Sequence, residues 1–196
     1  MNRTMEAVEL PVEQLMAAYA RGMFPMVHED GELYWHDPDP RAVFDLTALQ
    51  PDRKTARMVR SGAYEFALDR DFELVVRACA SREETWIDER IVRSYTELHR
   101  AGVAHCVSVR STGDRVVGGI YGVALGGAFF AESMFGTNNA GKMAFHHMAA
   151  HLNANGFLLL DTQYINPFTR QLGAFEIPRA RFRELLAQAL VADVTF

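Results

Sequence analysis

Residues 114–135 constrain the fold more than any other stretch of this sequence. They read DRVVGGIYGVALGGAFFAESMF, two apolar runs separated by LGG. Runs rich in β-branched and aromatic residues on either side of a glycine turn predict two long antiparallel strands. A classical parallel nucleotide-binding sheet is not expected to contain such a hairpin, because its strands alternate with helices.

The flanking segments extend this prediction. Helical periodicity and end signals predict helices over 11–22, 50–62, 72–81, 88–102, 142–156 and 179–190. Further strands are predicted over 64–69, 104–111 and 157–165. We expect residues 23–44 to be irregular and 167–178 to be a loop with a short turn. The sequence therefore predicts a mixed α/β fold around a largely antiparallel sheet.

Composition excludes several classes of protein. The 196 residues suit one domain, or a small domain packed on a larger one, and no apolar run is long enough to span a membrane. The first residues lack a signal-peptide core, so we expect a cytoplasmic protein. The two cysteines lack C-x-x-C spacing, so no metal site is predicted. Cys106 follows His105, but strand neighbours point to opposite faces, and we expect a buried core thiol.

The net charge of −5 argues against wholesale coating of nucleic acid but permits a local basic patch. Two groups of basic residues are candidates, one within 53–60 and one within 179–183. Either group taken alone is explained as well by a solvated helix face.

The stretch GTNNAGKMAF, residues 136–145, has the G-x-x-x-x-G-K spacing of a P-loop. However, Met143 stands where a P-loop has the Ser or Thr that holds Mg²⁺. Too few residues follow for the further strand–helix units, and the preceding strand is predicted to pair in a hairpin. We therefore do not predict an NTPase, although backbone N–H groups at a helix start, with Lys142 nearby, suit an anion such as an RNA phosphate.

Two predicted strands carry polar groups late in an apolar run, Glu132 in AFFAESMF and Asp161 with Gln163 in FLLLDTQY. Period-two geometry predicts that Asp161 and Gln163 share one face and that Thr162 points the other way. A carboxylate after four apolar residues is either a paired structural acid or a functional group, and its local sequence fits both. Surrounding apolar side chains suit either a core or an apolar pocket, namely Phe129, Phe130, Met134, Phe135, Tyr164 and Phe168.

Several blocks together identify a family. In order they are YARGMFPM, YWHDPDPRAV, TWI, YTELHRAGVAH, VVGGIYGVALGGAFFAESMF, NAGK, LLLDTQ and LGAFEIPRARF. At these intervals, from about Tyr19 to Phe182, the chain resembles the leucyl/phenylalanyl-tRNA–protein transferases. That family usually has N-A-S-K where this chain has NAGK, which explains the misleading P-loop spacing.

The resemblance implies a function and an architecture. Members transfer Leu, Phe or sometimes Met from aminoacyl-tRNA to the N-terminal Lys or Arg of a protein, which marks that protein for degradation. It implies a small N-terminal domain, placed at residues 1–62, and a catalytic domain resembling the acyl-CoA N-acyltransferase fold, placed at 63–196. We expect no cofactor, a monomer, and aminoacyl-tRNA and a protein N-terminus as partners.

The resemblance also implies roles for single residues. Asp161 matches the catalytic acid, which orients Gln163 or acts as a base, and Glu132 binds a cationic amine or shapes the site. Trp35 matches an aromatic that stacks on the terminal adenosine. The remaining candidates are the apolar pocket residues Met134, Phe135, Phe130 and Ser133, and the anion or tRNA contacts Lys142, Arg41 and Arg179.

The chain departs from the family at several positions. Thr162 replaces a usual Cys, Ala131 a usual Gly, Arg110 a usual Trp, and Phe168 lies where a His is usual. Two alternatives therefore stay open: an acyltransferase with CoA or another small donor, and a non-catalytic module that binds aminoacyl-tRNA or N-termini. The pyrophosphate loop of CoA enzymes, Q/R-x-x-G-x-G/A, is absent from the sequence.

Overall fold

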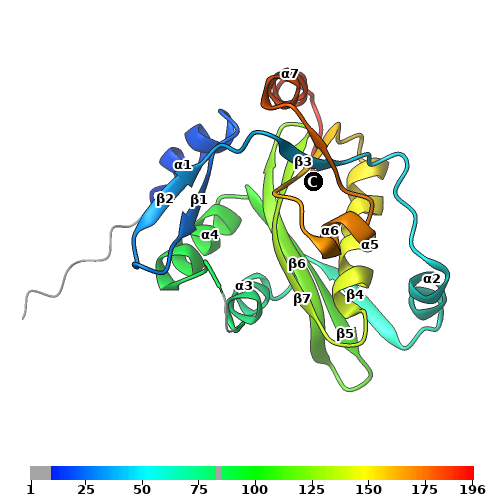
Figure 1. Ribbon diagram of the computed structural model, residues 1–196. Helices are drawn as coiled ribbons and strands as arrows, with labels where there is room; N and C mark the ends of the chain where they lie inside the picture. Colours follow the sequence, from blue (N-terminus) through cyan, green and yellow to red (C-terminus); the bar gives the residue numbers. More distant parts are fainter. Residues whose placement is uncertain (1–9, 83–84) are drawn as a thin grey trace, which may run out of the picture.

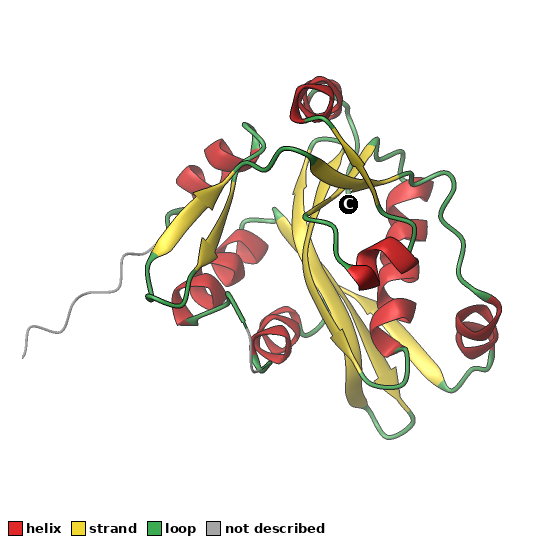
Figure 2. Cartoon of the chain, viewed as in Figure 1, coloured by secondary structure: helices red, strands yellow, loops and turns green. Residues whose placement is uncertain are grey.

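The computed structural model describes residues 10–82 and 85–196. It confirms a mixed α/β fold around a largely antiparallel sheet (Figures 1 and 2). The helices of this part of the chain are α1 (Val12–Tyr19), α2 (Arg53–Arg60), α3 (Phe72–Ala80), α4 (Glu89–Arg100), α5 (Ala140–Ala154), α6 (Pro167–Gln171) and α7 (Arg179–Leu190). Its strands are β1 (Phe24–Val27), β2 (Leu33–His36), β3 (Arg41–Phe44), β4 (Tyr64–Leu68), β5 (Ala104–Ser111), β6 (Arg115–Leu125), β7 (Ala128–Gly136), β8 (Leu159–Gln163) and β9 (Phe175–Ile177).

The large sheet runs in the order β4-β5-β6-β7-β8-β3-β9 across the described residues. The predicted hairpin is confirmed, with β6 and β7 antiparallel and Leu125 opposite Ala128. Neighbouring strands are antiparallel except β7 and β8, which are parallel. Helix α5 packs on one face and helices α3 and α4 on the other, so a separate apolar core fills each side (Figure 1).

Two predictions of irregular structure are wrong. Within 23–44, β1 and β2 form a separate two-stranded sheet, and β3 joins the large sheet between β8 and β9. Within 167–178, the chain forms α6, capped by the Asn166 side chain, and then β9. These strands are three or four residues long, too short for a readable alternation, and prolines lie among them. Since β3 precedes residue 62, the large sheet draws on both sides of the predicted domain boundary.

The glycines of the GTNNAGK stretch serve close packing. A Cβ atom on Gly136 would lie 2.2 Å from the backbone nitrogen of Gly141, and one on Gly141 would lie 3.0 Å from the Phe135 carbonyl oxygen. The end of β7 thus touches the first turn of α5, and side chains at these positions would separate them. This packing and the antiparallel partner of β7 confirm that the stretch is not a P-loop.

No helix in the described ranges combines the length and the apolar character that a membrane crossing requires.

Candidate active site

A pocket of about 210 Å³ lies where β7 and β8 meet the loop that leads into α6. Its lining combines apolar walls with a few polar groups, as is typical of a small-molecule subsite. The lining residues are Met26, Arg82, Trp86, Ile120, Ala131, Glu132, Ser133, Met134, Phe145, Thr162, Gln163, Tyr164, Asn166, Phe168 and Thr169.

Asp161 lies beneath this pocket and is fully buried. Arg41, also fully buried, donates from Nε to Oδ1 at 2.8 Å and from Nη2 to Oδ2 at 2.7 Å. Arg41 also donates to the Gly22 carbonyl at 2.7 Å, and its guanidinium lies over the rings of Phe24 and Phe182. The carboxylate is therefore fixed on both oxygens by a charged, bidentate partner.

Gln163 is placed in the pocket by an unusual backbone conformation. Its φ is +64°, in the left-handed region that non-glycine residues adopt only at a cost of about 1–3 kcal/mol. The Gln163 backbone N–H donates to Asp161 Oδ1 at 3.0 Å, which holds the residue in that conformation. The buried Arg41–Asp161 pair thus fixes the backbone of Gln163, which lines the pocket.

The strand alternation predicted for this segment is wrong. Opposite β3, Gln163 pairs with Ala42 and Asp161 with Val43, so Thr162 is an extra residue in the ladder. Thr162 and Gln163 consequently both line the pocket, while Asp161 lies below it. Such bulges re-aim side chains and occur often beside active sites.

Glu132 is the carboxylate that borders the pocket. On β7 it is an extra residue between Ala131 and Ser133, which pair with consecutive residues of β6. Its Oε1 accepts from the Tyr19 hydroxyl at 2.7 Å and from Gln163 Nε2 at 2.9 Å. Among the described residues, Oε2 has no hydrogen-bond partner although it is buried.

Burial is the main reason that the pKa of Glu132 is raised to about 7. The hydrogen bonds from Tyr19 and Gln163 favour the charged form and only partly offset the loss of hydration. A second hydrogen bond joins the hydroxyls of Tyr19 and Tyr95, so the carboxylate rests on a buried tyrosine pair. Glu132 therefore combines a free oxygen with a pKa suited to proton exchange near neutral pH.

The predicted pocket residues divide into two groups. Met134 and Ser133 line the pocket with Glu132 and Gln163. Phe130 is fully buried, with its ring 4.9 Å from that of Tyr19, and belongs to the core.

Trp35 and Phe135 are also outside the pocket lining. Both are partly buried and pack against the core, and Trp35 faces Pro25 in the small sheet. The stacking of Trp35 on the terminal adenosine stays a prediction.

Seven lining residues were not singled out from the sequence: Met26, Arg82, Trp86, Ile120, Phe145, Asn166 and Thr169. Tyr164 and Phe168, which suited either a core or an apolar pocket, line the pocket. Arg82 Nη2 donates to the Ser133 hydroxyl at 2.7 Å and to the Met134 carbonyl at 2.5 Å. The signal for Trp86 was present, because the TWI block contains it, whereas nothing in the local sequence marks Arg82.

The three predicted anion contacts have different environments. Arg41 is buried against Asp161, so the prediction that it contacts RNA is wrong. Arg179 is paired with Asp37 at 3.6 Å and with Asp39 at 4.0 Å, and is not a free cation. Lys142 is partly exposed, 5.9 Å from the centre of the Phe168 ring, and stays a candidate.

The four residues that depart from the family pattern also fall into two groups, those that line the pocket and one that does not. Ala131, Thr162 and Phe168 line the pocket. Arg110 does not; it lies on β5 with Nη2 2.6 Å from Asp71 Oδ2 and Nη1 2.7 Å from Asp114 Oδ1. Its replacement of a usual aromatic therefore leaves the walls of this pocket unchanged.

Cys106 is fully buried, as predicted, and burial raises the pKa of its thiol. This environment suits an inert core residue rather than a nucleophile. No cluster of three or more metal-binding side chains occurs in the part of the chain that the structure describes.

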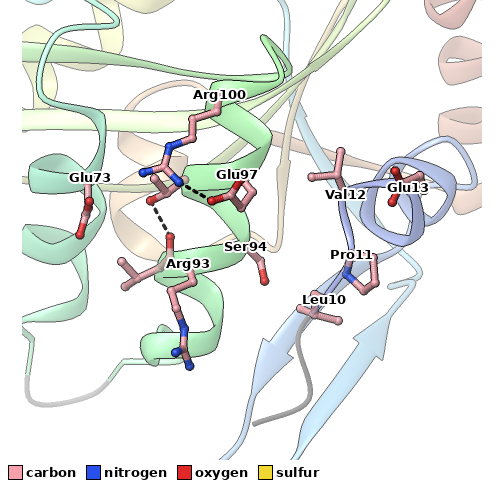
Figure 3. Close-up of a pocket in the computed structure, with 11 residues that line it drawn as sticks. Leu10, Pro11, Val12, Glu13, Glu73, Arg93, Ser94, Glu97 and Arg100 are labelled. Carbon is pink, nitrogen blue, oxygen red and sulfur yellow. Dashed lines mark hydrogen bonds and ion pairs between the residues drawn. The ribbon is translucent and has the colours of Figure 1, made fainter. Parts of the chain in front are cut away.

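A second cavity, of about 500 Å³, lies between the start of α1 and helix α4 (Figure 3). Glu97 and Arg100 are paired there on one turn of α4, opposite Pro11 and Glu13 (Figure 3). Its lining shares no residue with the pocket at Glu132, so the chemistry proposed below does not involve it.

Comparisons with known proteins agree with the sequence resemblance. The family model for leucyl/phenylalanyl-tRNA protein transferase matches residues 43–187, and the model of its N-terminal domain matches residues 8–39. A transferase of that name from Rubrobacter xylanophilus is 46% identical over 96% of this chain and 100% of its own length. One from Chlorobium luteolum is 44% identical over 95% of this chain and 99% of its own.

The matches over nearly the whole chain identify the protein as an enzyme of the group-transfer class. The chain belongs to the leucyl/phenylalanyl-tRNA–protein transferase family. Among solved structures, L-PGS from Bacillus licheniformis covers 78% of this chain and 51% of its own at 15% identity and a TM-score of 0.45, a likeness too distant to say anything of function.

Proposed function

We propose that the protein transfers Leu or Phe from aminoacyl-tRNA to the N-terminal Lys or Arg of a protein, marking it for degradation. The observation that carries this proposal is Glu132, a buried carboxylate on the pocket with an unpartnered Oε2 and a pKa raised to about 7. An attacking α-amine arrives protonated and must give up a proton, and Oε2 is a carboxylate oxygen at the pocket that no described protein group occupies.

The donor side chain occupies the apolar part of the pocket. Met134, Phe145 and Ile120 supply walls without hydrogen-bonding groups, so a polar side chain would lie there unpaired. Trp86 and Tyr164 border the same pocket and join Trp35 as candidate platforms for the terminal base.

The chemistry requires few groups because aminoacyl esters are reactive, and positioning supplies much of the rate. Glu132 takes one proton from the ammonium, and the free amine attacks the ester carbonyl. The second hydrogen on Gln163 Nε2 is available to the tetrahedral oxyanion, since the first goes to Glu132. The new amide bond forms as the C–O bond breaks, and the 3′ oxygen leaves with a second nitrogen proton.

In this scheme Asp161 is a positioning residue. Both of its oxygens accept from Arg41 and Oδ1 also accepts from the Gln163 backbone, so it has no group directed at the substrate. Of the two roles expected from the resemblance, orienting Gln163 fits these contacts and acting as the base does not.

In this proposal the tRNA binds along a basic surface on α2. Arg53, Lys54, Arg57 and Arg60 are exposed on that helix, and none of them forms an ion pair with another described residue. Helix α2 packs on α5, and Lys142 at the start of α5 lies 4.0 Å from Asp52 and beside Phe168 of the pocket. A chain of cations therefore leads from the pocket to α2. We propose that the protein acts as a monomer, because one chain carries all of these groups, and that it acts in the cytoplasm.

The test is a transfer assay. Purified protein is incubated with tRNA charged with labelled Leu, Phe or Met and with peptides that start with Arg, Lys, Asp or Ala, and the product is measured by mass. We expect Leu or Phe on the Arg and Lys peptides, and loss of transfer but not of tRNA binding in Glu132→Gln. Binding without transfer in the unmodified protein would favour a binding module. Absence of both would favour a transferase with a small donor.

A further inference from the structure

Two buried tyrosines that the proposed chemistry does not use lie directly behind Glu132. Tyr19 of α1 donates its hydroxyl hydrogen to Glu132 Oε1 at 2.7 Å, and a second hydrogen bond joins its hydroxyl to that of Tyr95 on α4. Neither side chain is exposed. The two tyrosines are 76 positions apart in the chain, so the packing of α1 against α4 brings their hydroxyls together at the carboxyl group.

Ring packing holds both hydroxyls in place. The Tyr19 ring lies 4.9 Å from that of Phe130, and the Tyr95 ring meets the Tyr121 ring edge to face at 5.7 Å. Because Tyr19 has one hydroxyl hydrogen and donates it to Glu132, its oxygen accepts the hydrogen of Tyr95. A hydroxyl that accepts one hydrogen bond donates the next one more strongly, so the two tyrosines act together on Oε1.

The pair determines which oxygen of Glu132 stays unoccupied. Oε1 accepts two hydrogen bonds from different elements, one from Tyr19 on α1 and one from Gln163 Nε2 on β8 at 2.9 Å. Rotation of the carboxyl group about its last bond would break both of them. Oε2 has no partner among the described residues, so the two donors fix the carboxyl group with this oxygen unoccupied.

We propose that Tyr19 and Tyr95 are positioning residues for Glu132, whose Oε1 they hold so that Oε2 stays unoccupied for the amine of the acceptor. This inference rests on the proposed aminoacyl transfer, because it concerns the group that takes the proton of the amine. It also gives helix α1, which lies outside the large sheet, a part in the chemistry.

The same contacts favour the ionised form of Glu132. Burial raises the pKa of this carboxyl to about 7, and the hydrogen bonds from Tyr19 and Gln163 keep the pKa from rising further. Burial, and then the charge of Glu132, raise the pKa values of Tyr19 and Tyr95 well above the ordinary value, so both stay hydroxyls. The other charged or titratable groups around them, among the described residues, are Arg41, Cys79, Arg82, Tyr121, Asp161 and Tyr164. Loss of either hydroxyl should therefore move the titration of Glu132 to higher pH.

The first readout is the titration of Glu132 itself, which needs no substrate. Carbon NMR of protein labelled in its glutamate carboxyl groups follows each titration, and the signal missing from Glu132→Gln identifies this one. We expect the midpoint near pH 7 to rise by about 1–2 pH units in Tyr19→Phe, the effect of losing a hydrogen bond to a charged group. In Tyr95→Phe it should rise by less, because Tyr19 still donates.

An unchanged midpoint in either variant overturns the inference, even if transfer in the unmodified protein is normal. A protein that shows both shifts but no transfer would instead contradict only the proposed function. The two failures are therefore distinguishable.

Tyr121 provides a matched control. It is fully buried and packs against Tyr95, but its hydroxyl has no hydrogen-bond partner among the described residues. Tyr121→Phe removes the same atom and should leave the midpoint unchanged. Equal shifts in Tyr19→Phe and Tyr121→Phe would assign the titration to burial alone and would overturn the inference.

The second readout is the single-turnover rate with both substrates saturating, from about pH 5.5 to 9.5. At pH 7 Tyr19→Phe should be roughly fivefold to fiftyfold slower than the unmodified protein, which corresponds to the expected rise of the midpoint. The difference should shrink as the pH rises, because more Glu132 ionises. A merely structural defect would slow the reaction by the same factor at every pH, and that result would contradict the inference.

Discussion

Both oxygens of Asp161 are held by Arg41, at 2.8 Å from Nε and 2.7 Å from Nη2, and neither residue is exposed. A buried pair of this kind contributes little net stability, but breaking it leaves an uncompensated charge. Since Asp161 also fixes the Gln163 backbone, the loss of this pair should both destabilise the fold and displace Gln163 in the pocket.

Removal of either partner should therefore destabilise the protein strongly. We expect Arg41→Met or Asp161→Leu to lower the free energy of unfolding by about 3–5 kcal/mol each. The double variant should lose far less than the sum, because no unpaired charge remains. Denaturant unfolding of all four proteins measures this coupling. Transfer should stay low in the double variant, because the Gln163 N–H has lost its acceptor; additive losses of stability would contradict the buried pair.

Glu132→Gln should make the protein more stable while it lowers transfer to a small residual rate. Burial raises the pKa of Glu132 from an ordinary 4.5 to about 7 in the folded state. As the pH rises from 4.5 to 7, the unfolded chain loses this proton and the folded chain keeps it, so the carboxyl destabilises the fold at higher pH. Above pH 7 the gain in Glu132→Gln should approach roughly 3 kcal/mol, and below pH 4.5 it should vanish.

Thermal unfolding of Glu132→Gln at pH 5 and pH 8 measures this difference. Glutamine is a suitable replacement because its oxygen still accepts from Tyr19 and Gln163. A variant that is less stable than the unmodified protein at pH 8 would show that Glu132 is an ordinary ionised carboxylate.

Most of the large sheet could be predicted, because the sequence patterns of its longer strands are local and extend over many residues. The hairpin of β6 and β7 and helix α5 have enough residues for a period to be read. The short strands β1, β2, β3 and β9 were missed because three or four residues show no period, and their pairing depends on distant parts of the chain.

The site could be predicted only in part for the same reason. Residue types and order identified Glu132, Asp161 and Gln163. Their geometry comes from two strand irregularities, the extra residues Glu132 and Thr162, and a regular alternation cannot reveal these. The partner of Asp161 lies 120 residues away, and so Arg41 was assigned to RNA instead of to the core.

Ala131→Gly should shift donor preference towards Phe. Ala131 lines the pocket, and removal of its methyl group enlarges the space available to a ring while Leu loses a packing contact. We expect the ratio of kcat/KM for Phe over Leu to rise about threefold or more. Ala128→Gly is the matched control, since Ala128 is a buried residue of the same strand outside the pocket lining. An equal shift in both variants would assign the effect to strand flexibility.

Arg57→Gln with Arg60→Gln should weaken tRNA binding and its dependence on salt. Each phosphate contact removed lowers the slope of log K against log salt by about 0.7–0.9. We expect the KM for charged tRNA to rise and kcat to stay unchanged. Binding at several salt concentrations measures the slope. Arg181→Gln, which removes an Arg paired with Glu184 on α7, should change neither quantity; an unchanged slope in the α2 variant would place the tRNA elsewhere.

The central claim is that the free oxygen of Glu132 takes the proton of the attacking amine. Its most direct test is the single-turnover rate of transfer between pH 5.5 and 8.5 with both substrates saturating, so that substrate binding does not contribute. The account predicts a rate that rises with pH and reaches half its maximum near pH 7, where Glu132 loses its proton, and no such rise in the residual rate of Glu132→Gln. A rate independent of pH, or the same profile in Glu132→Gln, would contradict it.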